Sequence, residues 1–280
     1  MRVKITSDST CDLSQEIIEK YDIYVLPLYV SLGAETRRDG VEVSPEDIYS
    51  YVRETGKLPT TSAPNIGDYL DMFRKWRDEG FEVVHYCISG DFSSACQNAQ
   101  MAAEEIGGVS VVDSRNLSTG QGLVVLYGAE MAQRGASADE IKRACDNMVD
   151  KVEASFVVDS IDYLYKGGRC SALAAFGANL LKLKPCIEVI DGKMKPTKKY
   201  RGNIDRVILS YVDDKLKDRT DIETHRIFIT HTACNPETVK LVSEKVKSYF
   251  GFDEIIETTA GCTVTSHCGP NTLGVLFIRK

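Results

Sequence analysis

The stretch Phe81-Glu82-Val83-Val84-His85-Tyr86-Cys87-Ile88 is followed at once by the loop Ser89-Gly90-Asp91-Phe92-Ser93-Ser94-Ala95. The first eight residues are rich in apolar, β-branched and aromatic side chains, which predicts a buried strand. The spacing of apolar residues in Ala95–Ile106 predicts a helix. A strand, a hydroxyl- and glycine-rich loop and a helix in this order are typical of an α/β layer. Such a loop presents backbone N–H groups and hydroxyls beyond the strand end, where they can bind an anionic or polar group.

The same order recurs through the first half of the chain. Further strands are predicted at Val3–Thr6, Tyr24–Ser31 and Val109–Asp113. Helices are predicted to begin at Ser44-Pro45-Glu46-Asp47, at Pro64 (running to about Glu79) and at Ser137-Ala138-Asp139-Glu140 (running to about Val152), where N-cap residues or proline precede acids. Alternating strands and helices predict an α/β domain with a largely parallel sheet.

The second half follows a different pattern. Asp191-Gly192 between the apolar run Cys186–Ile190 and Lys193–Lys198 predicts a hairpin, because this dipeptide suits a type I′ turn. The other predicted elements are a helix at Ile204–Lys217, a helix from Asn235-Pro236, and strands at Ile227–Thr230, Glu254–Thr258 and Leu273–Ile278. We therefore expect two domains, an α/β domain over residues 1–155 and an α+β domain over residues 156–280. Residues 171–181 are apolar on most faces, which fits either a core helix or the wall of an acyl tunnel.

Composition narrows the classes of function. The chain has 280 residues and a formal net charge of -7, which argues against nucleic acid as a partner. No apolar run approaches the roughly 20 residues that span a bilayer, and the first residues enter a strand pattern directly, so we expect a cytoplasmic protein. Nine cysteines without a Cys-x-x-Cys pair argue against a disulfide framework and a zinc ribbon. We expect no metal and no cofactor.

Several motifs along the whole chain match one known family. They are Asp8-Ser9-Thr10-Cys11-Asp12-Leu13, Thr61-Ser62-Ala63-Pro64, Ile88 to Ala99, Asp113-Ser114, Ser118 to Gly122, Tyr163 to Arg169, Lys184-Pro185 and His267-Cys268-Gly269-Pro270-Asn271-Thr272-Leu273-Gly274. In this order and at this spacing, the sequence resembles the DegV family of fatty-acid-binding proteins. It departs from the usual pattern at Ser94, where a glycine is common, at Ala95, which lacks a hydroxyl, and at Cys268, where a threonine is common.

The resemblance implies two domains with a long-chain fatty acid buried between them. It implies a carrier that is not itself an enzyme. The carrier would act as the acyl-binding subunit of a bacterial fatty-acid kinase, whose separate catalytic subunit phosphorylates the carboxylate. Supply of acyl groups to phospholipid synthesis is the expected role, and it is compatible with transient contact with a membrane surface. The carboxylate is expected near the threonine–serine loop, the second serine loop and the late histidine. The ligand-binding residues are predicted to be Thr61, Ser62, Ser93, Ser94, Arg169 and His267.

Each predicted residue also has a plainer interpretation. Thr61 and Ser62 precede a predicted helix, so they could cap it, with or without a ligand. Ser93 could be a nucleophile with His267 in a hydrolase, although the Gly-x-Ser-x-Gly pattern is missing. Arg169 follows Lys166-Gly167-Gly168, which fits a helix C-terminus, a phosphate cradle or a surface for the kinase.

His267 could be structural, or could bind a metal with Cys262 and Cys268, although this spacing is not that of a zinc site. A binder of another small anion, such as a phosphorylated metabolite, remains a further alternative to a fatty-acid carrier.

Overall fold

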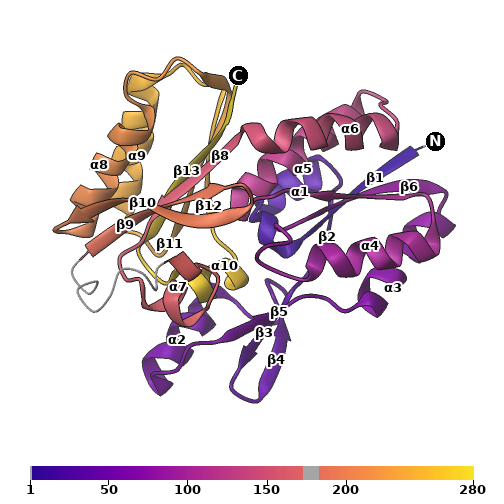
Figure 1. The fold of residues 1–280 in the computed structure, drawn as a ribbon, viewed down its shortest axis with the longest axis horizontal. Helices are drawn as coiled ribbons and strands as arrows, with labels where there is room; N and C mark the ends of the chain where they lie inside the picture. The colour runs from indigo at the N-terminus through magenta and orange to yellow at the C-terminus, as the bar shows by residue number, and fades with distance from the viewer. Residues whose placement is uncertain (1, 173–182) are drawn as a thin grey trace.

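The structure, a computed structural model, describes residues 2–172 and 183–280. Figure 1 shows the N-terminal part of the chain (indigo to magenta) beside the C-terminal part (orange to yellow), with a large sheet in each. None of the helices in these two ranges is long and apolar enough to span a bilayer.

The N-terminal part is built on a parallel sheet in the strand order β2-β1-β6-β7. Its strands are β1 (Arg2–Asp8), β2 (Tyr24–Leu26), β6 (Phe81–Cys87) and β7 (Val109–Asp113), and its helices are α1 (Gln15–Lys20), α3 (Ile66–Asp78), α4 (Ala95–Ile106), α5 (Ser118–Gln133) and α6 (Ala138–Met148). Val84 and Tyr86 pack towards α5 and α6, whereas Val83 and Cys87 pack towards α3 and α4. The predicted parallel α/β layer is confirmed, and the loops after its strands gather at one edge.

The predicted strand Tyr24–Ser31 is wrong as a single element. The chain forms β2, breaks at Pro27, and continues as β3 (Tyr29–Leu32) in another sheet. Proline has no N–H to donate to a ladder, which favours the break. Strand β3 pairs antiparallel with β4 (Glu35–Arg38) and β5 (Thr60–Ser62), forming a small sheet near the bottom of Figure 1.

Three of the four predicted helix starts in this part are confirmed, among them α4 at Ala95. Helices α2 (Pro45–Thr55) and α6 begin with the capping boxes predicted at Ser44 and Ser137. Helix α3 begins two residues after Pro64, because the Asn65 side chain accepts a hydrogen bond from the backbone N–H three residues later. Helix α6 ends at Met148, earlier than predicted, and a 3-10 turn, η2 (Val149–Lys151), leads into the next strand.

The C-terminal part is built on a six-stranded mixed sheet in the order β10-β9-β8-β13-β11-β12. Its strands are β8 (Val152–Val157), β9 (Leu183–Ile190), β10 (Lys193–Arg201), β11 (Ile222–Thr232), β12 (Glu254–Thr259) and β13 (Thr272–Arg279), and its helices are α7 (Asp162–Lys166), α8 (Ile204–Leu216), α9 (Pro236–Tyr249) and α10 (Cys262–Cys268). Strands β9 and β10 form the predicted hairpin, and both turn residues, Asp191 and Gly192, have positive φ. Figure 1 shows α8 and α9 together on one side of this sheet.

Helix α5 joins the two parts. Its Leu123, Val124 and Leu126 lie in one core cluster with Ile5 of β1 and Phe228 of β11. A helix that is apolar on every face is expected in such a buried position. The predicted boundary between residues 155 and 156 falls inside β8, and the division into domains stays a prediction. The predicted apolar helix at residues 171–181 lies almost entirely outside the described residues.

Candidate functional site

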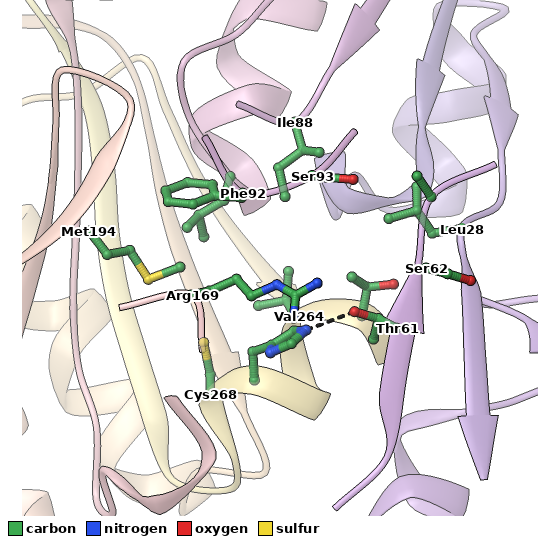
Figure 2. A pocket seen from close by; sticks show the side chains of 14 residues that line it. Leu28, Thr61, Ser62, Ile88, Phe92, Ser93, Arg169, Met194, Val264 and Cys268 are labelled. Carbon is green, nitrogen blue, oxygen red and sulfur yellow. Dashed lines mark hydrogen bonds between the residues drawn. The ribbon is translucent and has the colours of Figure 1, made fainter. Parts of the chain in front are cut away.

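A pocket lies where β5, the loops after β6 and β7, and helix α10 meet. It holds about 500 Å³ of empty space, its open mouth included (Figure 2). The polar residues that line it are Thr61, Ser62, Ser93, Arg169, Thr263 and His267. Five of the six predicted binding residues therefore line one pocket, although they come from segments up to 206 residues apart. Ser94 is the exception, because it is exposed and does not line the pocket.

Thr61 and His267 form the direct link across the pocket. Thr61 Oγ1 lies 2.8 Å from His267 Nε2, the bond drawn as a dashed line in Figure 2. Thr61 lies on strand β5, opposite Val30 of β3. It therefore does not cap a helix, and neither does Ser62; the cap of α3 is Asn65. The capping interpretation of these two hydroxyls was wrong.

His267 lies on helix α10, which the sequence patterns did not predict. The side chain is buried, and a Cβ atom added at Gly167 would clash with its Nδ1, so the glycine lets the α7 end approach the ring closely. Burial, with a smaller contribution from the Arg169 guanidinium, lowers the pKa of His267 to about 4. The imidazole is therefore neutral at pH 7, with one nitrogen able to donate a hydrogen bond.

Arg169 supplies the permanent positive charge of the pocket. Figure 2 shows its side chain extending into the pocket from the side of Met194 towards Thr61. The guanidinium donates one hydrogen bond, to the Gly167 carbonyl at 2.9 Å, and the residue is exposed at the mouth. Among the described residues that line this pocket, there is no aspartate or glutamate. A cation and several hydroxyls without a neighbouring acid favour an anionic guest.

Two hydroxyls complete the polar wall. Ser93 Oγ accepts a hydrogen bond from the Ala95 N–H at 3.2 Å, which leaves its own proton available. The Thr263 hydroxyl is buried and has no hydrogen-bond partner among the described residues. Thr263 was not among the predicted residues, and its place four residues before His267 in a hydroxyl-rich segment was the one available signal.

The remaining wall is apolar, and a second cavity adjoins it. Leu28, Ile88, Phe92 and Met194 line the first pocket. The second cavity lies against β8, β11 and β13 and holds about 330 Å³ of empty space, its opening included. Both cavities are lined by Leu117, Val264 and Cys268, which we call the neck. A polar head site, an apolar wall and an adjoining cavity suit a guest with a charged end and a long hydrocarbon tail.

The geometry does not support covalent catalysis or metal binding. His267 Nε2 is bonded to Thr61 and not to Ser93, and no acid in the described residues hydrogen-bonds to the ring. A catalytic triad needs a base that is hydrogen-bonded to the nucleophile and oriented by an acid, and the described residues provide neither contact to His267. Cys262 donates from Sγ to the Val43 carbonyl at 3.1 Å, away from the pocket. Over residues 2–172 and 183–280, no group of three acids, histidines and cysteines is arranged to hold a metal ion.

Comparison with known proteins identifies the family. The profile described as "Uncharacterised protein, DegV family" matches residues 2–280. This chain belongs to the DegV family. The predicted family is thereby confirmed, over nearly the whole chain.

Relatives in the DegV family have been described as lipid binders. A fatty acid-binding protein of Thermotoga maritima is 34% identical over 282 residues, which cover 98% of this chain and 96% of the relative. A fatty-acid-binding DegV protein from Thermus thermophilus has a similar structure, with a TM-score of 0.89 and 30% identity over the full length of both chains. A stearic acid-binding protein from Eubacterium ventriosum superposes with a TM-score of 0.84 at 29% identity, over 99% of this chain and 98% of the other.

Proposed function

We propose that this protein binds a long-chain fatty acid and holds its carboxylate for phosphorylation by a separate kinase subunit. Thr61, Ser62, Ser93, Arg169 and His267 bind the carboxylate, and the tail passes the neck into the second cavity. The observation that carries the proposal is a pocket lined by hydrogen-bond donors, with no acid among its described lining residues, that adjoins a second, mainly apolar cavity. The protein is a cytoplasmic carrier without a cofactor, and the DegV relatives that bind fatty acids support this role.

The free-energy contributions assign separate roles to the acyl tail and the carboxylate of the fatty acid. Burying about fourteen methylenes at about 0.8 kcal/mol each contributes on the order of 11 kcal/mol before the costs of association. Ordering of the ligand and lost translational freedom offset several kcal/mol of that. Each charge-assisted hydrogen bond to the carboxylate contributes roughly 1.5–3 kcal/mol, most of which offsets desolvation of the carboxylate. The tail therefore sets affinity, while Thr61 and His267 set the position of the carboxylate oxygens.

The identity of the guest is tested by extracting the purified protein with organic solvent and analysing the extract by mass spectrometry. We expect one or more long-chain fatty acids in an amount close to that of the protein. Recovery of a phosphorylated metabolite in their place would support the alternative small-anion binder and contradict the proposal. The control is protein that is boiled, washed and then extracted in the same way, which measures lipid that adheres non-specifically.

The carrier role is tested with loaded protein, ATP and a bacterial fatty-acid kinase subunit. Transfer of the γ-phosphoryl group to a carboxylate oxygen yields ADP and an acyl phosphate, which hydroxylamine converts to a hydroxamate and phosphate. We expect hydroxamate only when the kinase subunit is present. Hydroxamate formed with ATP alone would make this protein an enzyme, and none in either reaction would contradict the carrier role.

A further inference from the structure

The motif Asp8-Ser9-Thr10-Cys11-Asp12 lies outside both cavities, although it contributes to the family resemblance. It forms the end of β1 and the 3-10 turn η1 (Ser9–Cys11). Asp8 and Asp12 are buried, and Asp39, between β4 and α2, is buried beside Asp12. Buried carboxylates are costly unless they are hydrogen-bonded, so their partners indicate what they do.

Asp12 and Asp39 hold the start of helix α10. Asp39 Oδ1 accepts from the Cys262 N–H at 2.9 Å, and its Oδ2 accepts from the Thr263 N–H at 3.1 Å. Asp12 Oδ1 accepts from the Gly261 N–H at 2.9 Å. The first three N–H groups of α10 are thus bonded to carboxylates that lie more than 220 residues earlier in the chain.

Helix α10 has no cap of its own. Its N-cap residue is Gly261, which has no side chain to accept these bonds. A Cβ atom at this position would lie 3.0 Å from Asp12 Oδ1 and 3.5 Å from Asp39 Oδ1, so glycine permits the close approach. A helix of seven residues is too short to be stable alone, and its position depends on such tertiary contacts.

Asp39 is also linked to the opposite wall of the pocket. Ser9 Oγ donates to Asp39 Oδ2 at 3.0 Å and accepts from the Leu28 N–H at 3.0 Å. The Asp39 N–H donates to the Leu28 carbonyl at 2.9 Å. Leu28 lines the pocket, and α10 contributes Thr263, Val264, His267 and Cys268 to it. Asp39 therefore lies behind two walls of the pocket, whereas Asp12 lies behind α10 alone.

We propose that Asp12 and Asp39 are positioning residues of the carboxylate site, which hold α10 so that His267 meets Thr61 without themselves touching the ligand. This inference rests on the proposed function. A shift of α10 by about an ångström would take the Thr61–His267 pair beyond hydrogen-bond range. Binding of the ligand carboxylate would therefore weaken, whereas the apolar contacts of the acyl tail tolerate small displacements.

The test compares a fatty acid with its methyl ester in the delipidated protein. For Asp39→Ala we expect binding of palmitate to weaken about tenfold, while binding of methyl palmitate changes by less than about twofold, because only the acid uses the head site. The matched control is Glu140→Ala, which removes a carboxylate bonded to the Ser137 N–H at the start of α6, far from the pocket. This control should change neither ligand.

A double-mutant cycle separates positioning from general stabilisation. If Asp39 acts through His267, palmitate binding to Asp39→Ala/His267→Ala should be no weaker than to His267→Ala alone. Additive losses, or an equal loss of acid and ester in Asp39→Ala, would overturn the proposal. Should Asp39→Ala not fold, Asp39→Asn keeps one acceptor and should show a smaller effect in the same direction; equal loss of both ligands in that variant overturns the proposal as well.

A ligand-free measurement distinguishes failure of this inference from failure of the proposed function. Nitrogen-15 NMR of the imidazole in the unliganded protein should show a hydrogen-bonded Nε2 of His267 in wild type and in Glu140→Ala, and loss of that bond in Asp39→Ala. If wild-type protein binds neither lipid, the proposed function is wrong, and the NMR measurement still tests the positioning role. An unchanged Nε2 hydrogen bond in Asp39→Ala would contradict that role.

Discussion

At the level of single residues, the pocket combines one exposed guanidinium with neutral donors and a buried, uncharged imidazole. Thr61 and His267 are bonded to each other, so a ligand carboxylate must join or replace that bond. Thr263 offers a buried hydroxyl without a partner in the described part of the chain. Ser93 retains a free proton for the same purpose. Under the proposed function, these side chains orient the ligand carboxylate through hydrogen bonds and charge.

Removing either partner of the central hydrogen bond should weaken head-group binding selectively. For Thr61→Val and His267→Ala we expect palmitate to bind about five- to tenfold more weakly, since one hydrogen bond to a charged group is lost. Competition against a fluorescent fatty acid measures the change. Ser94→Ala is the matched control, because Ser94 is an exposed serine beside Ser93 that does not line the pocket. Equal weakening by Ser94→Ala and Thr61→Val would contradict this assignment of the head site.

The depressed pKa of His267 predicts a specific loss of stability in acid. The folded value is about 4 against an ordinary 6.5, so the unfolded chain takes up the proton first as pH falls. The stability contribution is therefore present above pH 6.5 and is lost as pH falls through 4. Between pH 6.5 and pH 4, the free energy of unfolding of the wild type should therefore fall by about 3 kcal/mol relative to that of His267→Gln.

Urea unfolding of both proteins at pH 7 and pH 4 measures this shift. The subtraction cancels other buried groups, including His85, whose pKa burial lowers to about 3, and Asp12, whose pKa burial raises to about 8. A difference that stays constant with pH would show that the ring is protonated in the folded protein as readily as in the unfolded chain.

At the level of elements, local sequence patterns correctly predicted those helices and strands that local interactions determine. The strand, loop and helix over residues 81–106 follow from apolar spacing, and the β9–β10 hairpin follows from Asp191-Gly192. Helix α10 was missed because Thr263, Val264 and Thr265 are β-branched and poor helix formers, so tertiary bonds from Asp39 must hold it. Helix α5 was missed because it is apolar on every face and has no amphipathic period.

The site residues could also be predicted only in part. Thr61 and His267 became candidates through a family resemblance and not through any local pattern, because they meet only in the folded chain. Ser94 was predicted together with Ser93, as part of the second serine loop of the family resemblance, yet Ser94 is exposed whereas Ser93 is half-buried. Asp39 carried no signal at all, since its partners lie more than 220 residues away.

The neck between α5 and α10 should control access of the tail to the second cavity. Val264→Phe adds a ring between the two cavities, so binding of palmitate should weaken at least about tenfold through lost methylene burial. Octanoate, whose tail is short, should bind nearly as before. Isothermal titration of both acids measures this, with Val264→Ala as the control that widens the neck. Equal losses for octanoate and palmitate in Val264→Phe would place the tail elsewhere.

At the level of the whole molecule, the two large sheets meet at α5, and the two adjoining cavities lie in the same region. Neither part holds the head site alone, because Thr61 and Ser93 come from the first part and Arg169 and His267 from the second. The core cluster around α5 contains residues of both parts and holds the segments that line the pocket together. A binding site assembled across a junction of this kind can enclose a guest that neither part would bury by itself.

A crystal structure of the protein with bound palmitate tests the central claim most directly. We predict a carboxylate oxygen within hydrogen-bond distance of Thr61 Oγ1 or His267 Nε2, with the acyl chain passing Leu117, Val264 and Cys268 into the cavity against β13. Electron density for the acyl chain outside this path, or side chains filling both cavities in a crystal grown with excess palmitate, would contradict it.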